Sequence, residues 1–437
     1  MVRAGYKQTE VGEIPEDWDV YEIQQLAKTG SGTTPARALH NKYYAQGKHN
    51  WVKTTDLNNS NINETEEKVS SEAIAETCLQ VYPVETILVA MYGGFNQIGR
   101  TGILRVPAAV NQALVAIKTN PKNLNPRFLL DVLNYRVLDW RKVASSSRKD
   151  PNITSNDVKG FKLSLPTITE QKAIAKALSD VDELIASLEK LITKKRDIKT
   201  ATMQQLLTGK KRLPGFGEGK GYKQTELGEI PEDWKIITLG EFADITKLAG
   251  FEYSNYFNSY KDGGDIIVVR GTNITNNVLD LSDVKSIPLE TSKQLPRSKL
   301  NKGDLVFAYV GTIGPVYLIE EDNKFHLGPN TAKITCKRKL DTRYLLAYFK
   351  SQFIKSEVEE KTSVGAQPSL SMTKIRSFRV IYPSLQEQKD ISAILDDIDS
   401  EISRLETSLY KTKAIKQGMM QELLTGRTRL LVKEGTA

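Results

Sequence analysis

The sequence has few of the residues that build metal sites, disulfides or membrane spans. Its 437 residues include two cysteines and three histidines, and no apolar run reaches the roughly 18 residues that a membrane-spanning helix needs. Cys78 and Cys336 have no second Cys or His at ligand spacing, so we expect buried thiols and neither a zinc site nor a disulfide. The polar start lacks the apolar core of a signal peptide, and we expect a cytoplasmic protein without membrane association.

Catalytic motifs are also missing from the sequence. It contains no Gly-x-x-x-x-Gly-Lys-Ser/Thr phosphate loop and no Asn/Asp-Pro-Pro-Tyr/Phe motif of base methyltransferases. Glu170-x-Lys172 and Glu387-x-Lys389 match half of a metal-dependent nuclease motif. That half is too short to be specific, and Glu is favoured in the first turn of any helix. We therefore expect a binding protein with no catalytic residues and no metal site, and keep a nuclease as a third class to test.

The composition is that of a folded, basic protein. Hydrophobic residues make up 39% and charged residues 26% of the chain, and the net charge is +8. This length suffices for two to three domains. The positive charge fits a polyanion partner such as nucleic acid, but charge alone does not establish one.

One long stretch occurs twice. From Thr167 to Gly209 the sequence has no Pro or Gly before its last residue. A matching stretch occurs later in the chain, with Glu387 in the place of Glu170, which is an offset of 217 residues (387 − 170). Apolar residues recur at alternating steps of four and three, which predicts a helix with a narrow seam for a partner helix. The seam residues are Ile174, Leu178, Val181, Ile185, Leu188 and Ile192 in the first copy and Ile391, Leu395, Ile398, Ile402, Leu405 and Leu409 in the second.

The seam slips near the end of both copies. Lys195 and Lys199 take the next seam positions in the first, and Thr412 and Lys416 take them in the second. The slip is either a docking surface for a partner or a stutter in the coiled coil.

A second repeat shows that the whole chain is duplicated. Residues 5–18 (Gly-Tyr-Lys-Gln-Thr-Glu-Val-Gly-Glu-Ile-Pro-Glu-Asp-Trp) return at 221–234 with one change, Leu227 for Val11, at an offset of 216 (221 − 5). We call this the repeated word. Two near-equal offsets indicate a tandem duplication of whole domains. The expected boundaries are 1–165 for the first head, 166–209 for the first long helix, 210–221 for a linker, 222–382 for the second head, 383–426 for the second long helix and 427–437 for a tail.

The segments between word and helix have diverged. Both contain apolar runs bounded by Gly, Asn and Pro, which predict strands, and each then has an amphipathic stretch, 126–142 and 341–361, that predicts a helix. We expect two α+β heads, separated by an antiparallel coiled coil of the two long helices and related by a pseudo-two-fold axis. A fixed frame with two different heads would produce this pattern.

This order of motifs resembles the DNA specificity (S) subunit of Type I restriction–modification enzymes. The resemblance rests on the repeated word, the Glu-Gln-Lys start of each helix (170–172, 387–389) and the Leu-Leu-Thr-Gly end (206–209, 423–426), and it covers essentially the whole chain. It implies that each head is a target-recognition domain for one half of a bipartite site in double-stranded DNA. It also implies that the helices are a spacer and that conserved regions dock two methyltransferase (M) subunits, with the chain itself non-catalytic.

The resemblance places all cofactors on partners. The methyltransferase would bring S-adenosylmethionine, and a motor and nuclease (R) subunit would use ATP with Mg²⁺; whether an R subunit accompanies this chain stays open. Residues 170–208 would form a rod of about 58 Å at 1.5 Å per residue, compared with about 34–36 Å for one turn of DNA. We therefore expect the helices to set the gap between the half-sites.

The expected DNA contacts are in loops rich in Gly, Arg, Asn, Gln and Thr, because these side chains pair with base edges and Gly permits close approach. Each is open to a second interpretation as a turn residue or a phosphate contact. The alternative function is a coiled-coil scaffold that joins two protein partners without DNA. The candidates are Thr33, Arg37, Thr54, Asn96, Gln97, Arg100, Arg148 and Lys149 in the first head, and Tyr253, Asn255, Arg270, Thr272, Asn273, Thr312 and Gln367 in the second.

Overall fold

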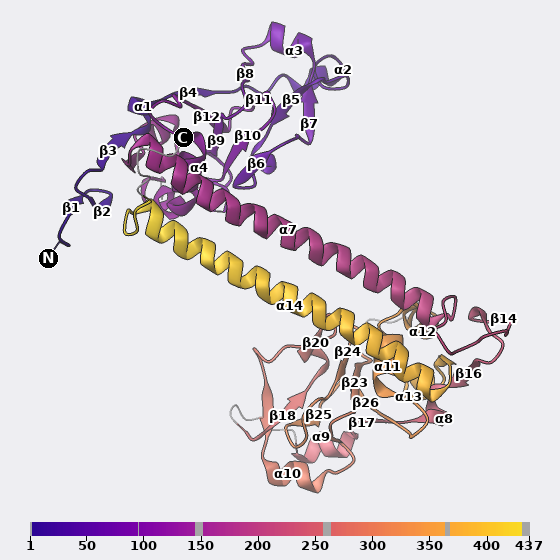
Figure 1. Cartoon of the computed structure of the whole chain (residues 1–437). Coiled ribbons are helices and arrows are strands. Elements are labelled where there is room, and N and C mark those ends of the chain that lie inside the picture. Colours follow the sequence, from indigo (N-terminus) through magenta and orange to yellow (C-terminus); the bar gives the residue numbers. More distant parts are fainter. Residues whose placement is uncertain (1, 95, 145–151, 257–263, 363–367, 431–437) are drawn as a thin grey trace. The chain divides into compact units, whose positions relative to one another are not determined.

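The computed structural model describes residues 2–94, 96–144, 152–256, 264–362 and 368–430. The chain divides into two compact units. Unit 1 comprises Met1–Glu189 and Thr407–Ala437, and unit 2 comprises Lys190–Glu406. The division cuts through both long helices, so each unit contains one head, the beginning of one long helix and the end of the other (Figure 1).

The two long helices are α7, Ile168–Leu207, and α14, Leu385–Leu424, each of 40 residues. In unit 1, Lys416 pairs with Asp182 and Lys413 with Glu189, both at 2.7 Å, so the residue numbers rise along α7 as they fall along α14. In unit 2, the pairs Lys195–Glu401 (2.8 Å) and Lys199–Asp399 (2.5 Å) have the same sense. The predicted antiparallel packing of the two helices is confirmed within each unit.

The predicted seam residues are all buried or half-buried. By contrast, Leu184, Ile198 and Ile415 are 50%, 41% and 58% exposed. The seam lysines of the slip are not inserted into an apolar core. They are 21–27% exposed and form the ion pairs across the helices just described.

The head of unit 1 contains two main sheets. A five-stranded sheet has the order β4-β12-β9-β10-β6, and a four-stranded sheet has the order β7-β5-β11-β8, in which β5 and β11 are parallel. The repeated word forms the hairpin β1-β2, and β3 pairs with β13 next to α7. The strands are β1 Tyr6–Thr9, β2 Gly12–Pro15, β3 Asp19–Glu22, β4 Ala27–Ser31, β5 His49–Val52, β6 Ser60–Ile62, β7 Glu67–Val69, β8 Val81–Tyr82, β9 Ile87–Ala90, β10 Thr101–Leu104, β11 Ala108–Val110, β12 Leu114–Thr119 and β13 Lys162–Leu165.

The head of unit 2 has the same strand orders except at one edge, where its larger sheet has no strand equivalent to β6 and residues 274–279 form the separate hairpin β19-β20. Its sheets have the orders β17-β26-β23-β24 and β21-β18-β25-β22, with β18 and β25 parallel, and its word forms the hairpin β14-β15. The strands are β14 Tyr222–Thr225, β15 Gly228–Pro231, β16 Lys235–Thr238, β17 Ala243–Lys247, β18 Ile266–Val269, β19 Ile274–Thr275, β20 Val278–Leu279, β21 Lys285–Ile287, β22 Lys299–Leu300, β23 Leu305–Ala308, β24 Val316–Leu318, β25 Phe325–Leu327, β26 Thr331–Cys336 and β27 Arg379–Tyr382.

Short helices complete both heads. They are, in unit 1, α1 Ile23–Leu26, η1 Arg37–Leu39, α2 His40–Tyr43, η2 Thr54–Asp56, α3 Ser71–Glu76, α4 Pro126–Tyr135, η3 Val137–Asp139, α5 Trp140–Val143 and α6 Ser155–Lys159, and, in unit 2, α8 Leu239–Phe242, α9 Gly250–Tyr256, η4 Gly271–Asn273, α10 Leu289–Gln294, α11 Thr342–Phe349, α12 Gln352–Lys361 and α13 Met372–Arg376.

The single helices predicted for 126–142 and 341–361 are each broken. Arg136 leaves the helical region at φ −98° and ψ 22° and donates hydrogen bonds to Asp139 and to the carbonyl of Lys162. In unit 2, Ser351 is extended and separates α11 from α12. Hydrophobic periodicity continues across both breaks, which is why the sequence did not show them.

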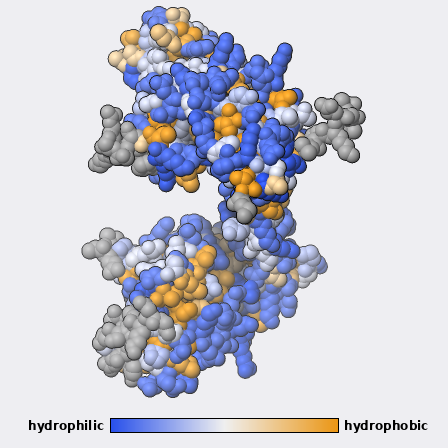
Figure 2. All heavy atoms as spheres, turned by 90° about the vertical axis from the view of Figure 1, so that its left-hand side faces the viewer, coloured by the Kyte–Doolittle hydropathy of each residue, from blue (hydrophilic) through white to orange (hydrophobic). Residues whose placement is uncertain are grey.

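The buried side chains fill the sheets and the sheet–helix interfaces of each head. One cluster in unit 1 joins Trp18, Phe128 and Ile174 to Leu423 of α14, so the beginning of α7 and the end of α14 belong to the same core. Cys336 is half-buried, but Cys78 is exposed, so the expectation of a buried thiol was wrong there. The face shown in Figure 2 is largely hydrophilic, with smaller hydrophobic areas between. No helix among the described residues is long and apolar enough to cross a membrane.

Candidate nucleic-acid interface and helix junctions

The repeated word of unit 1 joins the beginning of α7 to the end of α14. Trp18 Nε1 donates to Glu170 Oε2 at 3.3 Å, and Arg429 donates to both oxygens of Glu170 at 2.7 and 2.8 Å. The same guanidinium donates to both oxygens of Asp17 at 2.8 Å and lies 5.5 Å from the Trp18 ring centroid. Hydrogen bonds from Arg429 lower the pKa of Asp17. We call these four side chains the unit 1 junction.

Unit 2 contains the same arrangement at the other pair of helix ends. Trp234 Nε1 donates to Glu387 Oε2 at 3.0 Å, and Arg212 donates to Glu387 at 2.7 and 3.0 Å. Arg212 also donates to Asp233 at 2.9 and 3.1 Å. Burial opposes the charge of Arg212, yet its hydrogen bonds to Asp233 and Glu387 raise its pKa. These four side chains form the unit 2 junction, and Arg212 ties the start of the segment 210–221 to the fold.

A tyrosine and a glycine complete each junction. Tyr6 Oη donates to the carbonyl of Gly426 at 2.8 Å, and Tyr222 Oη donates to that of Gly209 at 3.0 Å. Both glycines have φ +71°, and a Cβ on either would lie 2.5 Å from a proline of the hairpin. Glycine is therefore required where each long helix ends against the word. This packing explains why a polar, loop-like word is repeated almost unchanged.

The junctions also account for the two Glu-x-Lys motifs. Glu170 and Glu387 are 2% and 1% exposed, and their oxygens are occupied by Arg and Trp donors. Among the described residues there is no group of three His, Cys, Asp or Glu side chains that could hold a metal ion. The structure gives these glutamates a role in packing the helix ends.

In the unit 1 head, one loop ends beside the start of β10, the strand that follows a second loop. The first contains η2 with Thr54 and ends at Asn59, and the second runs from Met91 to Gly99 and carries Asn96 and Gln97. Asn59 has φ 59°, and its Oδ1 accepts from the Thr101 amide at 3.0 Å. Arg100 follows the second loop and is half-buried. Four of the predicted contacts, Thr54, Asn96, Gln97 and Arg100, therefore lie on or beside these two loops.

The corresponding loops meet in unit 2. The first contains η4 and Asn277, whose Oδ1 accepts from the Val316 amide at 2.9 Å. Asn59 accepts from the Thr101 amide in the same way in unit 1. The second runs from Tyr309 to Gly314 and carries the exposed Thr312. The Gly314 amide donates to the Ala308 carbonyl, and the Gly99 amide donates to that of Ala90, so the two second loops start and end at equivalent places.

Two predicted contacts of unit 2 hold the first loop in place. Asn273 is 4% exposed; it accepts from the Arg270 amide and Nε and donates to the carbonyls of Asp280 and Asp283. Arg270 also pairs with the Asp283 carboxylate at 3.0 Å. Thr272, between them, is exposed. Arg270 and Asn273 thus position the loop that presents Thr272.

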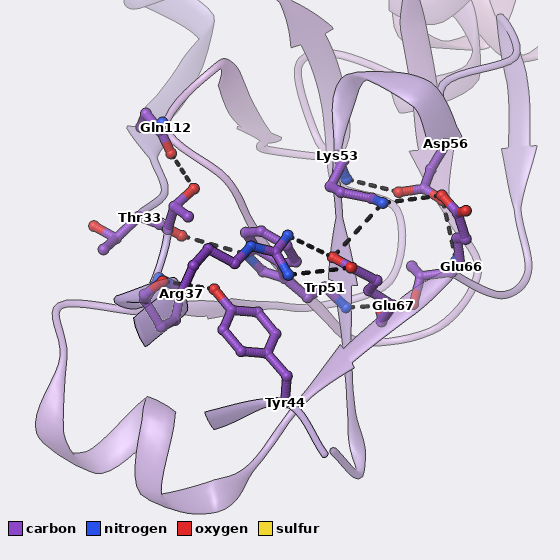
Figure 3. Close-up of polar contacts among 12 residues, drawn as sticks. Thr33, Arg37, Tyr44, Trp51, Lys53, Asp56, Glu66, Glu67 and Gln112 are labelled. Atoms are coloured by element: carbon purple, nitrogen blue, oxygen red, sulfur yellow. Dashed lines mark hydrogen bonds and ion pairs between the residues drawn. The ribbon is translucent and has the colours of Figure 1, made fainter. Parts of the chain in front are cut away.

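Thr33 and Arg37 lie beside β5 and β7, and Glu67 links Arg37 to Lys53 at the start of the first loop (Figure 3). Arg37 donates to both oxygens of Glu67 at 3.1 and 2.7 Å and lies 4.3 Å from the Tyr44 ring centroid. The Thr33 carbonyl accepts from Trp51 Nε1 at 3.2 Å. Hydrogen bonding to Glu67 raises the pKa of Arg37, and Arg37 in turn lowers that of Glu67.

Several predicted contacts fall outside the described structure. Arg148, Lys149 and Gln367 are among the residues that are not described, and Tyr253 and Asn255 lie on α9 without described side chains. Their roles stay predictions from sequence. The sequence reasoning also passed over the residues that shape the site: Asn59 and Asn277 with their positive φ, and Arg212 and Arg429. The last two were detectable, since both follow a repeated Leu-Leu-Thr-Gly by three residues.

Comparison with known proteins identifies the family. The model of the Type I restriction modification DNA specificity domain matches residues 15–196 and 231–413, one match in each repeat. The chain belongs to this family. The match confirms the resemblance drawn from the sequence and supports DNA-sequence recognition over the scaffold alternative.

Individual members of the specificity family are similar over most of the chain. The MjaVIII specificity subunit of Methanocaldococcus jannaschii is 25% identical over 95% of this chain and 94% of its own length. The EcoBI specificity subunit of Escherichia coli is 26% identical over 79% of this chain and 73% of its own. The crystal structure of the S subunit of a Type I restriction-modification system from M. genitalium has the same fold, with a TM-score of 0.57 at 17% identity, covering 93% of this chain and 96% of that one.

Proposed function

We propose that this chain is the non-catalytic specificity subunit of a Type I restriction–modification complex, in which each head reads one half of a bipartite DNA target. The observation that carries the proposal is the contrast within each unit. The junctions are repeated, and so are the strand orders apart from β6, whereas the two loops at the edge of each head differ in length and side chains. A protein that reads two unlike sequences from equivalent frames requires this combination.

The partners and the spacing belong to the same proposal. Two methyltransferase subunits would dock on the repeated frame and supply S-adenosylmethionine, and a motor and nuclease subunit would supply ATP- and Mg²⁺-dependent cleavage. The 40-residue helices α7 and α14 would set the gap between the half-sites. Inserting residues in α7 near Gln204 should then lengthen the gap and leave both half-sites unchanged; altered half-sites with an unchanged gap would contradict the spacer role.

The function is tested by selecting duplexes from a random pool with the chain in complex with its methyltransferase partner, at several salt concentrations. We expect one bipartite motif of two unlike halves, and log affinity that falls linearly with log salt because phosphate contacts release counterions. Absent or salt-independent binding would instead support the protein scaffold. Cleavage by the isolated chain with Mg²⁺, lost in Glu170→Ala, would support a nuclease.

A further inference from the structure

Unit 2 contains a groove at the edge where its two loops meet. The groove has a volume of about 780 Å³. One wall is formed by residues 271–272, 274–277 and 312–315, and the other by residues 349–350 at the end of α11 and residues 354, 355, 358 and 359 of α12. It lies wholly within unit 2.

The loop wall presents polar side chains from a fixed backbone. Thr272, Thr275, Asn276 and Thr312 line the groove and are exposed, and among the described residues none of their side chains makes a hydrogen bond. Arg270 and Asn273 hold one end of the first loop, and Asn277 holds the other. The four side chains therefore have unused donors and acceptors on a rigid support.

The facing wall supplies positive charge. Lys355 is exposed and has no ion pair among the described residues, and Lys350 is half-buried, where burial lowers its pKa. Glu359 is the carboxylate in the same lining. The two walls also contribute the half-buried apolar side chains Ile313 and Val358. Polar loop residues, apolar side chains and an ammonium group match the edges, faces and phosphates of nucleotides.

Building on the proposed function, we propose that this groove is where unit 2 reads its half-site, with Asn276 and Thr312 at base edges and Lys355 at a phosphate. An Asn amide can pair with both N6 and N7 of adenine, and a Thr hydroxyl can pair with several bases. A lysine on phosphate positions the duplex without reading its sequence. Gly314 leaves the approach open, because a Cβ there would meet no atom within 4 Å.

Asn276→Gly tests the base contact without straining the backbone. Asn276 has φ 52°, which glycine adopts readily, so the variant removes the amide alone. In complex with its methyltransferase, it should relax the base preference at one or two positions of one half-site. The preference there should fall by about 10-fold or more, since a bidentate pair contributes about 1–3 kcal/mol of discrimination. Asn323→Gly is the matched control, because Asn323 is also exposed at φ 58° but lies outside the groove.

Lys355→Gln tests the phosphate contact. It should weaken binding to all duplexes to a similar degree and reduce the slope of log affinity against log salt by about 0.9, the value for one phosphate. Lys302→Gln, which removes an exposed lysine outside the groove, should leave the slope unchanged.

The outcomes separate this proposal from the proposed function. A wild-type complex that selects no bipartite motif contradicts the function. If the wild-type complex selects a bipartite motif but Asn276→Gly and Lys355→Gln are both indistinguishable from their controls, only the assignment of the groove as the reading site is contradicted. Loss of methyltransferase association with unchanged sequence preference would show that the groove binds a protein segment, and would likewise overturn it.

Discussion

The two units share the same junctions at the ends of the long helices and differ in the loops at the edge of each head. In the junctions, the hydrogen bonds between arginine and glutamate are 2.7 and 2.8 Å in unit 1 and 2.7 and 3.0 Å in unit 2. The second loops, by contrast, have nine residues in unit 1 (91–99) and six in unit 2 (309–314). Gly99 packs against Trp140, whereas Gly314 is open. The difference shows that duplication preserved the contacts that join the helices and released those at the edge of each head.

A second difference lies within the heads. Asp131 of α4 is fully buried, while the residue 216 positions later is Ala347. Arg127 pairs with Asp131 and also with Asp182 of α7, and Lys416 of α14 pairs with Asp182 at 2.7 Å. Unit 1 therefore has a charge cluster between its head and the long helices. In unit 2 Arg343 pairs with Asp396 of α14, and no carboxylate takes the place of Asp131.

The largest expected effect comes from breaking a junction. Glu170→Ala should destabilise unit 1, and Glu387→Ala unit 2, each by about 3–5 kcal/mol. The change removes the charged hydrogen bonds to the arginine, which keeps only its aspartate partner, and it leaves the indole N–H without an acceptor. The measurement is chemical denaturation followed by hydrogen exchange in each unit. Glu183→Ala, on the exposed side of α7, is the control and should have little effect. An effect confined to one of the two glutamates would mean that the junctions are not equivalent.

The buried carboxyl gives a smaller effect that depends on pH. Burial raises the pKa of Asp131 to about 6, so the folded state binds a proton more tightly than the unfolded state does. Ionised Asp131 costs stability progressively as pH rises from about 4 to 6. Asp131→Asn should therefore exceed the wild type in unfolding free energy by about 2–3 kcal/mol at pH 8, with the gain disappearing near pH 4. A difference that does not vary with pH would contradict the assignment.

The smallest effect concerns the helices themselves. Gly418 of α14 takes the place of Ala201 in α7, and a Cβ at Gly418 would meet no atom within 4 Å. Gly418→Ala should stabilise the protein by about 0.8–1 kcal/mol through helix propensity. Gly209→Ala, at φ +71° and against Pro231, should destabilise it. Thermal unfolding of the two variants measures both changes in stability, and changes of the same sign would contradict the prediction.

Much of the frame could be predicted from sequence because it is periodic or repeated. The seam residues, from Ile174 to Leu409, follow from hydrophobic spacing, and the duplication follows from the word and the helix ends. The breaks at Arg136 and Ser351 could not be predicted, since backbone conformation there is decided by hydrogen bonds to residues distant in sequence. Likewise, nothing local to Trp18 indicates that it packs against Glu170 and Arg429, at separations of 152 and 411 residues (170 − 18 and 429 − 18).

The sequence predicted which residue types the candidate site would contain better than which positions would line it. Composition favoured Thr272 and Thr312, which do line one groove. It favoured Arg270 and Asn273 equally, although both are used to hold the loop, because propensity does not distinguish a side chain that contacts a ligand from one that supports it. Asn276 was passed over, since its positive φ and its exposure are visible only in the folded chain.

The most direct test of the account is a chain with two identical heads. Replacing residues 235–378 by residues 19–161 keeps both repeated words and both long helices, and it exchanges the head that carries the reading loops. In complex with the methyltransferase, this chain should select two copies of the half-site read by unit 1, in inverted orientation and with the wild-type gap. A selected motif that still contained the half-site of the replaced head would contradict the account.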